Sequence, residues 1–321
     1  MWHLEKPSSQ ELEQYVGWLM PMIKKRINDK RKAGHYLIWC AYLLPDDKHD
    51  KKIYDVLVAE PEELIRLNKQ YLKEMSDLKP VGRKRYTKKQ LKSFLLSVFD
   101  YTIVKEERAY KVAGLKKVNT CPYCNRNYTF AIGQDKNGKT ISKVRPQFDH
   151  WFAHTQYPLL GLSFYNLIPS CSVCNSSVKG QTTFSLDKYI HPYTTKDSNP
   201  NFKFLPILTY NEDEDCVKWS VLLKRQKNTK EDNTIKALLL DKLYSEHGEL
   251  EVKDIMDFAI KNNPTYLRSL FGHVCEDLNE EYSPTDVYRL LFGVEAELDK
   301  TLARPLSKLK RDILEGEGIV I

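Results

Sequence analysis

The sequence predicts a mainly helical α+β protein in which a small, metal-held unit of strands and a helix lies between two helical regions. Three observations support this. Two Cys-x-x-Cys motifs enclose strand-like runs, helix-start signals recur in the first 110 residues, and short helical stretches follow residue 232. We expect a basic helical region at 1–110, the metal-held unit at 111–195 and an acidic, mainly helical region at 196–321.

Helix signals are clearest in the N-terminal region. Residues 8–11 form a capping box that opens a helix, which Pro21 is expected to break or kink. Pro61 suits the first position of another helix, and a loop is predicted over 79–85. Thr87 caps a helix with one apolar face, which we expect in the core: Leu91, Phe94, Leu95, Val98 and Phe99.

The two Cys-x-x-Cys motifs, Cys121 with Cys124 and Cys171 with Cys174, carry the most specific chemical signal in the chain. Each two-residue gap lets one tight turn present two sulfurs to a metal, and the long intervening segment brings the pairs together. The motifs therefore predict a structural Zn²⁺ held by four thiolates. The other cysteines are expected to be ordinary thiols: Cys40, Cys216 and Cys275.

The segment between the motifs is predicted to run strand, loop, strand, helix. A turn at 135–138 precedes a strand that ends in the short apolar run 148–152. Residues 162–170 lead into the second motif as another strand, and 175–180 form a short helix closed by a glycine. After the unit, a linker at 194–200, strands at 202–210 and 217–223, and short helices over 232–314 are predicted.

Candidate chemistry lies in the side chains of this unit. His150 suits a general base, because an imidazole titrates near neutrality and can take a proton from water. Asp149 and Asn175 suit a Mg²⁺ or Mn²⁺ site, because these ions prefer oxygen ligands and keep positions for phosphate and water. Together these residue types indicate hydrolysis of a phosphodiester bond.

With Asp149 and His150, then Asn166, then Asn175 directly after the second cysteine motif, residues 119–193 resemble the HNH endonuclease family. The resemblance covers under a quarter of the chain. It implies a ββα-metal fold with a general-base histidine and a divalent-cation site, and it implies that Asn166 orients the loop holding His150. The third motif letter is often histidine. Here it is Asn175, whose neutral amide is a weak ligand, so metal affinity is expected to depend on substrate phosphate.

Segments 119–126, 162–175 and 190–193 also resemble the PtuB-type HNH nucleases of Septu and retron-associated anti-phage defence systems. Members of that group act with a separate ATPase subunit, so the resemblance implies a defence effector with a PtuA-like partner. DNA is the leading substrate. RNA, such as tRNA, is the alternative, because attack by water does not require the 2′-OH. A different alternative is a catalytically weak zinc module that binds nucleic acid or a partner protein.

Charge is distributed unevenly. Residues 1–120 contain 25 Lys and Arg against 16 Asp and Glu, residues 121–195 contain 7 against 3, and the remainder contains 18 against 24. The basic part favours nucleic-acid contacts, although a solvated helix face is the commoner explanation of any one short charge run. Its main clusters are 24–26, 30–32 and 83–89. The acidic part is the better candidate for holding the ATPase, or for self-association as a homodimer.

Four residues near the motifs have competing interpretations. His154 is close enough in sequence to join the site, or it is exposed, and His191 is expected to pack or cap. Lys179 and Arg145 are candidates to pair with a phosphate. The chain has no apolar run long enough to span a membrane and its start lacks a signal peptide, so a cytoplasmic location without membrane contact is expected.

Overall fold

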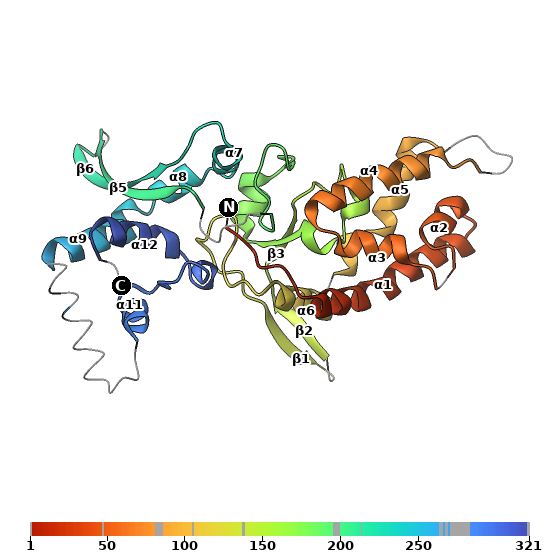
Figure 1. Ribbon diagram of the computed structural model, residues 1–321, viewed down its shortest axis with the longest axis horizontal. Helices are drawn as coiled ribbons and strands as arrows, with labels where there is room; N and C mark the ends of the chain where they lie inside the picture. Colours follow the sequence, from red (N-terminus) through yellow and green to blue (C-terminus); the bar gives the residue numbers. More distant parts are fainter. Residues whose placement is uncertain are drawn as a thin grey trace.

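The chain forms a mainly helical α+β structure in the computed structural model (Figure 1). In the residues described, its strands form three separate antiparallel pairs. Figure 1 shows α1 to α5 at one end, the C-terminal elements at the other, and β3 between them. The structure describes residues 2–46, 48–80, 86–104, 106–136, 139–194, 200–212, 214–262, 266, 269 and 283–319. Within these residues, no helix combines the length and apolar character needed to span a membrane.

The N-terminal region is helical, as predicted. The capping boxes at Ser8 and Thr87 are present, and Pro61 occupies the first turn of its helix. The apolar face that Thr87 introduces is buried in the core. The helices are α1 (Ser9–Lys32), α2 (Leu37–Leu43), α3 (Lys51–Val58), α4 (Pro61–Asp77), α5 (Lys88–Val98) and α6 (Glu106–Lys116), with a 3₁₀ turn η1 at Tyr101–Ile103.

A break or a kink is expected at Pro21, and the break does not occur: α1 continues through this residue to Lys32. A proline removes one helical hydrogen bond and crowds the preceding turn. In α1 the side chains on both sides of it, Leu19 and Ile23, are fully buried. Burial of this face outweighs the local cost of the proline and keeps the helix continuous.

The central unit has the predicted order of elements. Strand β1 (Ile132–Lys136) pairs with β2 (Lys139–Val144) across a turn whose two central residues lie outside the described part. Strand β3 (Gln147–His150) pairs antiparallel with β4 (Leu167–Ser170), and the helix η4 (Val173–Lys179) follows with π-type hydrogen bonding.

The pairing of β3 with β4 is shorter than the predicted strands, and Asn166 explains where it ends. Its amide Oδ1 accepts from the Phe152 N–H at 2.6 Å, and its Nδ2 donates to the Phe152 carbonyl at 3.2 Å. A side chain therefore takes the two backbone groups that a longer ladder would have used. Residues before β4 instead form two 3₁₀ turns, η2 (Pro158–Leu160) and η3 (Phe164–Asn166).

The C-terminal region has the two predicted strands, which pair as an antiparallel hairpin, and the predicted short helices. Strand β5 (Lys203–Asn211) pairs with β6 (Cys216–Lys224), and the helix α12 (Ser307–Gly316) packs against β5. The other described elements are α7 (Lys230–Ala237), α8 (Leu240–Ser245), η5 (Gly248–Val252), α9 (Lys253–Lys261), α11 (Pro284–Phe292), η6 (Thr301–Ala303) and α12 (Ser307–Gly316). Most of the predicted linker (195–199), part of the basic cluster (83–85) and Cys275 lie outside the described residues.

The C-terminal region is bonded directly to the first cysteine loop. The Asn125 amide Nδ2 donates to the carbonyls of Thr301 and Arg304, each at 3.0 Å, and the Leu306 N–H donates to the Asn125 carbonyl at 2.6 Å. The Tyr244 hydroxyl donates to the carbonyl of Cys124, the last residue of the motif, at 2.5 Å. The two regions therefore share one folded interface instead of meeting at a free linker.

Candidate active site and four-cysteine cluster

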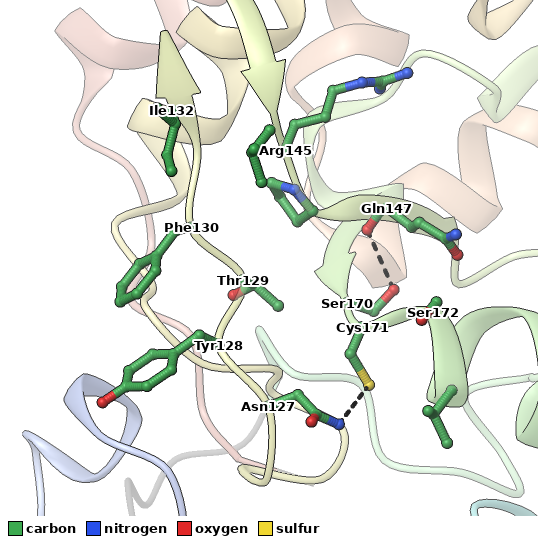
Figure 2. Close-up of a pocket in the computed structure, with 13 residues that line it drawn as sticks. Asn127, Tyr128, Thr129, Phe130, Ile132, Arg145, Gln147, Ser170, Cys171 and Ser172 are labelled. Carbon is green, nitrogen blue, oxygen red and sulfur yellow. Dashed lines mark hydrogen bonds between the residues drawn. The ribbon is translucent and has the colours of Figure 1, made fainter.

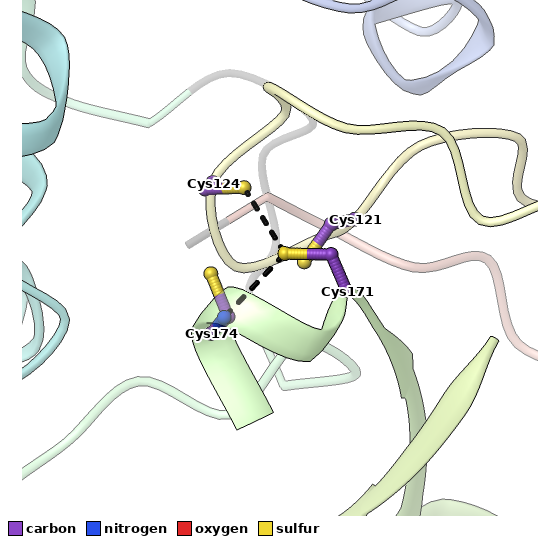
Figure 3. Close-up of side chains that lie close together, drawn as sticks. All are labelled: Cys121, Cys124, Cys171 and Cys174. Atoms are coloured by element: carbon purple, nitrogen blue, oxygen red, sulfur yellow. Dashed lines mark hydrogen bonds between the residues drawn. The ribbon is translucent and has the colours of Figure 1, made fainter. Parts of the chain in front are cut away.

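The four cysteines of the two motifs converge on one buried point (Figure 3). Cys121 and Cys124 come from the loop after α6, Cys171 lies at the end of β4, and Cys174 lies in η4. All four sulfurs lie within 4.8 Å of one another, and the Cys124 and Cys171 sulfurs are 3.9 Å apart. Four Zn–S bonds of about 2.3 Å in a tetrahedron place sulfurs about 3.8 Å apart. The cluster is thus suited to a structural Zn²⁺.

Electrostatics also favours a cation in this cluster. Hydrogen bonds from Cys121 and Cys124 lower the pKa of the Cys171 thiol, and the same neighbours raise the pKa of Cys174. Four adjacent thiolates repel one another, so all four ionise only around a positive charge. The Asn127 amide and the Arg126 N–H add hydrogen bonds to sulfur, at 3.5 and 3.4 Å, of the kind that support thiolate ligands.

His150 is the last residue of β3 and is partly buried. Its Nε2 lies 2.9 Å from the Gly161 carbonyl oxygen, which can only accept, so Nε2 carries the hydrogen and Nδ1 holds a lone pair. Nδ1 has no hydrogen-bond partner among the described residues. Burial lowers the pKa of His150 to about 4, with the Gly161 bond opposing this shift. The ring is neutral at physiological pH and can accept a proton at Nδ1.

Asn166 is fully buried and ties together the loop that follows His150. Besides its two bonds to Phe152, the side chain donates from Nδ2 to the Leu160 carbonyl at 2.9 Å. The backbone carbonyl of Asn166 accepts from the Trp151 N–H at 3.0 Å. The loop that carries Gly161 is thereby fixed against the strand that carries His150. The side chain has no contact with the pocket described below.

Asp149 forms a buried ion pair. The Lys179 Nζ lies 2.9 and 2.7 Å from its two carboxylate oxygens and 2.8 Å from the His150 carbonyl. The Tyr123 hydroxyl donates to the same carboxylate at 2.5 Å. Both charged side chains are buried, Lys179 at 3% and Asp149 at 6% exposure. The carboxylate therefore already accepts three close hydrogen bonds from two donor groups and has a full counter-charge.

Asn175 lies at the edge of the pocket that His150 and Asp149 also line. Its Nδ2 donates to the Gln147 Oε1 at 2.9 Å, and the Ser176 hydroxyl donates to the same oxygen at 3.0 Å. Asp149, His150, Asn175 and Lys179 all line one pocket of about 330 Å³, together with the loop from Ala153 to Gln156 and residues 180–183. The structure thus brings three of the four predicted polar side chains to one cavity and places Asn166 behind it.

The oxygens of Asp149 and Asn175 are of the type that Mg²⁺ or Mn²⁺ binds, but the charge arrangement does not fit such an ion. A divalent cation on Asp149 would have to displace the Lys179 ammonium or lie beside it, against the repulsion of like charges. The described residues around Asp149 hold no second carboxylate that would offset this cost. As arranged, the site already contains its cation.

The other residues singled out in the sequence have distinct positions. The His154 ring stacks on His150, with centroids 5.0 Å apart, and lines the same pocket. His191 is fully buried among aromatic rings, in the packing role expected of it. Lys179 pairs with Asp149, whereas Arg145 is exposed and donates to the Tyr101 hydroxyl at 2.9 Å. Exposed Arg145 remains available to a phosphate.

Two contributors to the site were not predicted from the sequence. The Gly161 carbonyl sets the tautomer of His150, and the Tyr123 hydroxyl holds Asp149. A backbone carbonyl has no sequence signal, so Gly161 could not have been found. Tyr123 lies inside the first cysteine motif, and its position between two predicted zinc ligands was the only available indication that it is close to the site.

Part of the basic N-terminal surface serves the fold. Arg26 donates to the carbonyls of Val98 and Asp100 at 3.1 and 2.9 Å, and Lys24 pairs with Asp50 at 2.7 Å. These contacts use charges from the first predicted basic cluster. They leave less of that cluster for nucleic acid than a count of its residues implies.

Comparison with known proteins gives a short match. No family model and no solved structure matches the chain. One similar curated protein is Protein ea31 of Escherichia phage lambda, 38% identical over 80 residues, which are 24% of this chain and 22% of that protein. The match thus spans about a fifth of the length of this relative. It is too short to assign the chain to a family.

Proposed function

We propose that the chain is an HNH-type nuclease that hydrolyses nucleic-acid phosphodiester bonds, with DNA as the leading substrate. The observation that carries the proposal is the His150 ring, whose Nε2 is committed to the Gly161 carbonyl at 2.9 Å while Nδ1 stays unprotonated beside the pocket. A ring held in one tautomer with a free lone pair is suited to general-base catalysis. The β3, β4 and η4 elements beside a four-cysteine cluster add support.

The residues of the pocket divide the work of hydrolysis. His150 Nδ1 takes a proton from a water molecule as the water oxygen attacks phosphorus. The bond from phosphorus to the leaving oxygen breaks, and the leaving oxygen takes a proton from solvent. Lys179 lines the same pocket, and its ion pair with Asp149 holds it in place. Asn166 fixes the loop that orients His150 through Gly161. The expected Mg²⁺ or Mn²⁺ dependence remains a prediction, which the Asp149 and Lys179 pair disfavours.

Substitution of His150 tests the proposal. We expect His150→Ala to lose cleavage by about two to four orders of magnitude, the range that one general base contributes, with unchanged zinc content and melting temperature. His49→Ala is the matched control, because His49 is exposed and remote in sequence. Supercoiled plasmid, single-stranded DNA and total RNA, each with Mg²⁺, Mn²⁺ or a chelator, identify the substrate. Cleavage by His150→Ala within a few-fold of wild type contradicts the assigned base.

A second candidate is a zinc module that binds nucleic acid or a protein without cutting. One observation favours it: the Asp149 carboxylate, expected as a metal ligand, is already neutralised by Lys179. If no substrate is cleaved under any metal condition, this candidate replaces the nuclease.

The ATPase partner and the role in anti-phage defence rest on the sequence resemblance and are tested by co-purification with the product of a neighbouring ATPase gene.

A further inference from the structure

An open groove of about 460 Å³ lies between the segment that follows the first cysteine motif and the paired strands β3 and β4 (Figure 2). One wall is the segment that follows the first cysteine motif and continues into β1, with Asn127, Tyr128 and Phe130. The opposite wall is formed by Gln147 of β3 and by residues 170–173. The groove therefore lies against the four-cysteine cluster.

The first wall presents an aromatic platform to solvent. Tyr128 is 50% and Phe130 46% exposed, and their rings stack with centroids 4.4 Å apart and planes 20° apart. Backbone bonds hold the segment rigidly, because Thr129 N–H donates to the Asn119 carbonyl at 2.7 Å and Tyr128 bridges to Thr120. Large exposed rings that are ordered by their backbone, not by burial, mark a surface prepared for a flat apolar partner.

The charge of the groove selects among such partners. Among the described residues that line the groove, Arg145 is the single charged one and none is Asp or Glu. The remaining polar groups are neutral donors and acceptors, among them Asn127, Gln147 and Ser172. Aromatic faces beside an arginine suit nucleobases attached to a phosphate backbone.

Two sets of contacts link the lining of the groove to the His150 pocket. Gln147 lines the groove, and its Oε1 accepts from Asn175, which lines the pocket. Arg145 lines the groove and bonds to the Tyr101 hydroxyl, and the Tyr101 ring packs edge-on against the His150 ring at 5.6 Å. Because the two linings are in contact, one single strand can reach from the pocket to the groove.

We propose that this groove binds an unstacked base of single-stranded nucleic acid on the Tyr128 and Phe130 platform, next to the bond positioned at His150. The inference deepens the proposed nuclease function and rests on it, because that function places the scissile bond of the nucleic-acid strand at His150. Bases in a duplex are stacked on one another and are not free to occupy the platform. The groove therefore gives preference to single-stranded or locally opened substrate.

The test measures binding separately from cleavage. A fluorescein-labelled oligothymidylate of about 12 nucleotides, a length that one such surface covers, is titrated with protein in the His150→Ala background and followed by anisotropy. Tyr128→Ala/Phe130→Ala should weaken binding about tenfold or more, from the loss of one stacked base, and should change affinity for a duplex of equal length by less than about twofold. Tyr128→Phe should bind as the parent.

The matched control is Leu208→Ala/Tyr210→Ala, which removes an exposed pair of similar size, 59% and 60% exposed, from β5. It should leave binding unchanged. Unaltered affinity of the Tyr128→Ala/Phe130→Ala variant, an equal loss on duplex, or no binding by the parent overturns the groove assignment. Selective loss of single-strand binding in a protein that cuts no substrate keeps the groove and rejects the nuclease, so the two failures are distinguishable.

Discussion

At the scale of single residues, the buried Lys179 and Asp149 pair decides how the site handles charge. Two ions removed from water are stable only when they neutralise each other and their remaining hydrogen-bonding positions are filled. Here the ammonium contacts both carboxylate oxygens and the His150 carbonyl, and Tyr123 supplies the further donor. Removing one partner leaves the other charge buried without compensation, so the pair can be tested from either side.

Lys179→Met should lower the free energy of unfolding by about 3–5 kcal/mol, the usual cost of leaving one buried charge unpaired. The same change frees the carboxylate of Asp149, so Mn²⁺ should bind to the variant and not to the wild type in the absence of nucleic acid. Chemical denaturation and the Mn²⁺ electron paramagnetic resonance signal measure the two effects. Lys218→Met, which removes a partly exposed pair with Glu214, is the control and should cost at most about 1 kcal/mol. Tight Mn²⁺ binding by the wild type would restore the metal site.

Two buried histidines predict how stability depends on pH. Burial lowers the pKa of His150 to about 4 and that of His191 to about 3, from 6.5. Between these values and 6.5 the unfolded chain binds protons that the folded chain does not. The contribution of these two histidines to the free energy of unfolding is therefore fully present above pH 6.5. It decreases as the pH falls toward 4. His191→Phe should flatten this decrease relative to His49→Phe, measured by urea denaturation from pH 7 to 4.5. Equal slopes in both variants would contradict the assignment.

At the scale of elements, the η2 turn connects the site to the N-terminal helices. A Cβ atom at Gly161 would lie 2.6 Å from the Phe99 carbonyl oxygen, and the contact is with backbone that cannot rotate away. Gly161 follows η2 and gives its own carbonyl to His150. The position is thus restricted to glycine by the close approach of α5, and any shift there is transmitted to the His150 ring.

Gly161→Ala should lower the free energy of unfolding by about 1–3 kcal/mol, through overpacking against Phe99, and should reduce cleavage more than it reduces folded protein at 25 °C. Gly17→Ala is the control, because Gly17 lies within α1, where an added methyl group would meet no other atom within 4 Å, and the change should stabilise the helix by about 0.5–1 kcal/mol. Thermal melts and rates at matched folded concentration measure both. An active, equally stable Gly161→Ala protein would exclude this coupling.

How far the sequence predicts these elements follows from the range of the interactions involved. The capping boxes at Ser8 and Thr87 were predictable because donor and acceptor lie three residues apart. The cysteine cluster was predictable because its spacing encodes two turns and one metal. The Lys179 partner and the Gly161 contact were not, since they join residues whose proximity only the complete fold creates.

At the scale of the whole molecule, the cysteine cluster is a junction between regions distant in sequence. The N-terminal segment bonds to it through the Trp2 N–H, which donates to the Pro122 carbonyl at 3.0 Å. The C-terminal region bonds to it through Asn125 and Tyr244. Removal of the acidic C-terminal region would take these partners away, so a search for the ATPase contact requires surface charge changes instead of deletion.

Loss of the metal should therefore loosen the C-terminal region as well as the central unit. Cys171→Ser removes one of four thiolates and should lower zinc content and melting temperature, because metal binding contributes to the folding free energy. Hydrogen exchange should rise at 301–306, where two carbonyls accept from Asn125 and the Leu306 N–H donates to it. Exchange should remain unchanged in α3 and α4, which have no hydrogen bond to the cysteine loop among the described residues. Cys216→Ser, outside the cluster, is the control. Stoichiometric zinc and an unchanged melting temperature in Cys171→Ser would reject the four-thiolate site. An increase in hydrogen exchange confined to the central unit would show that the junction does not couple the two regions.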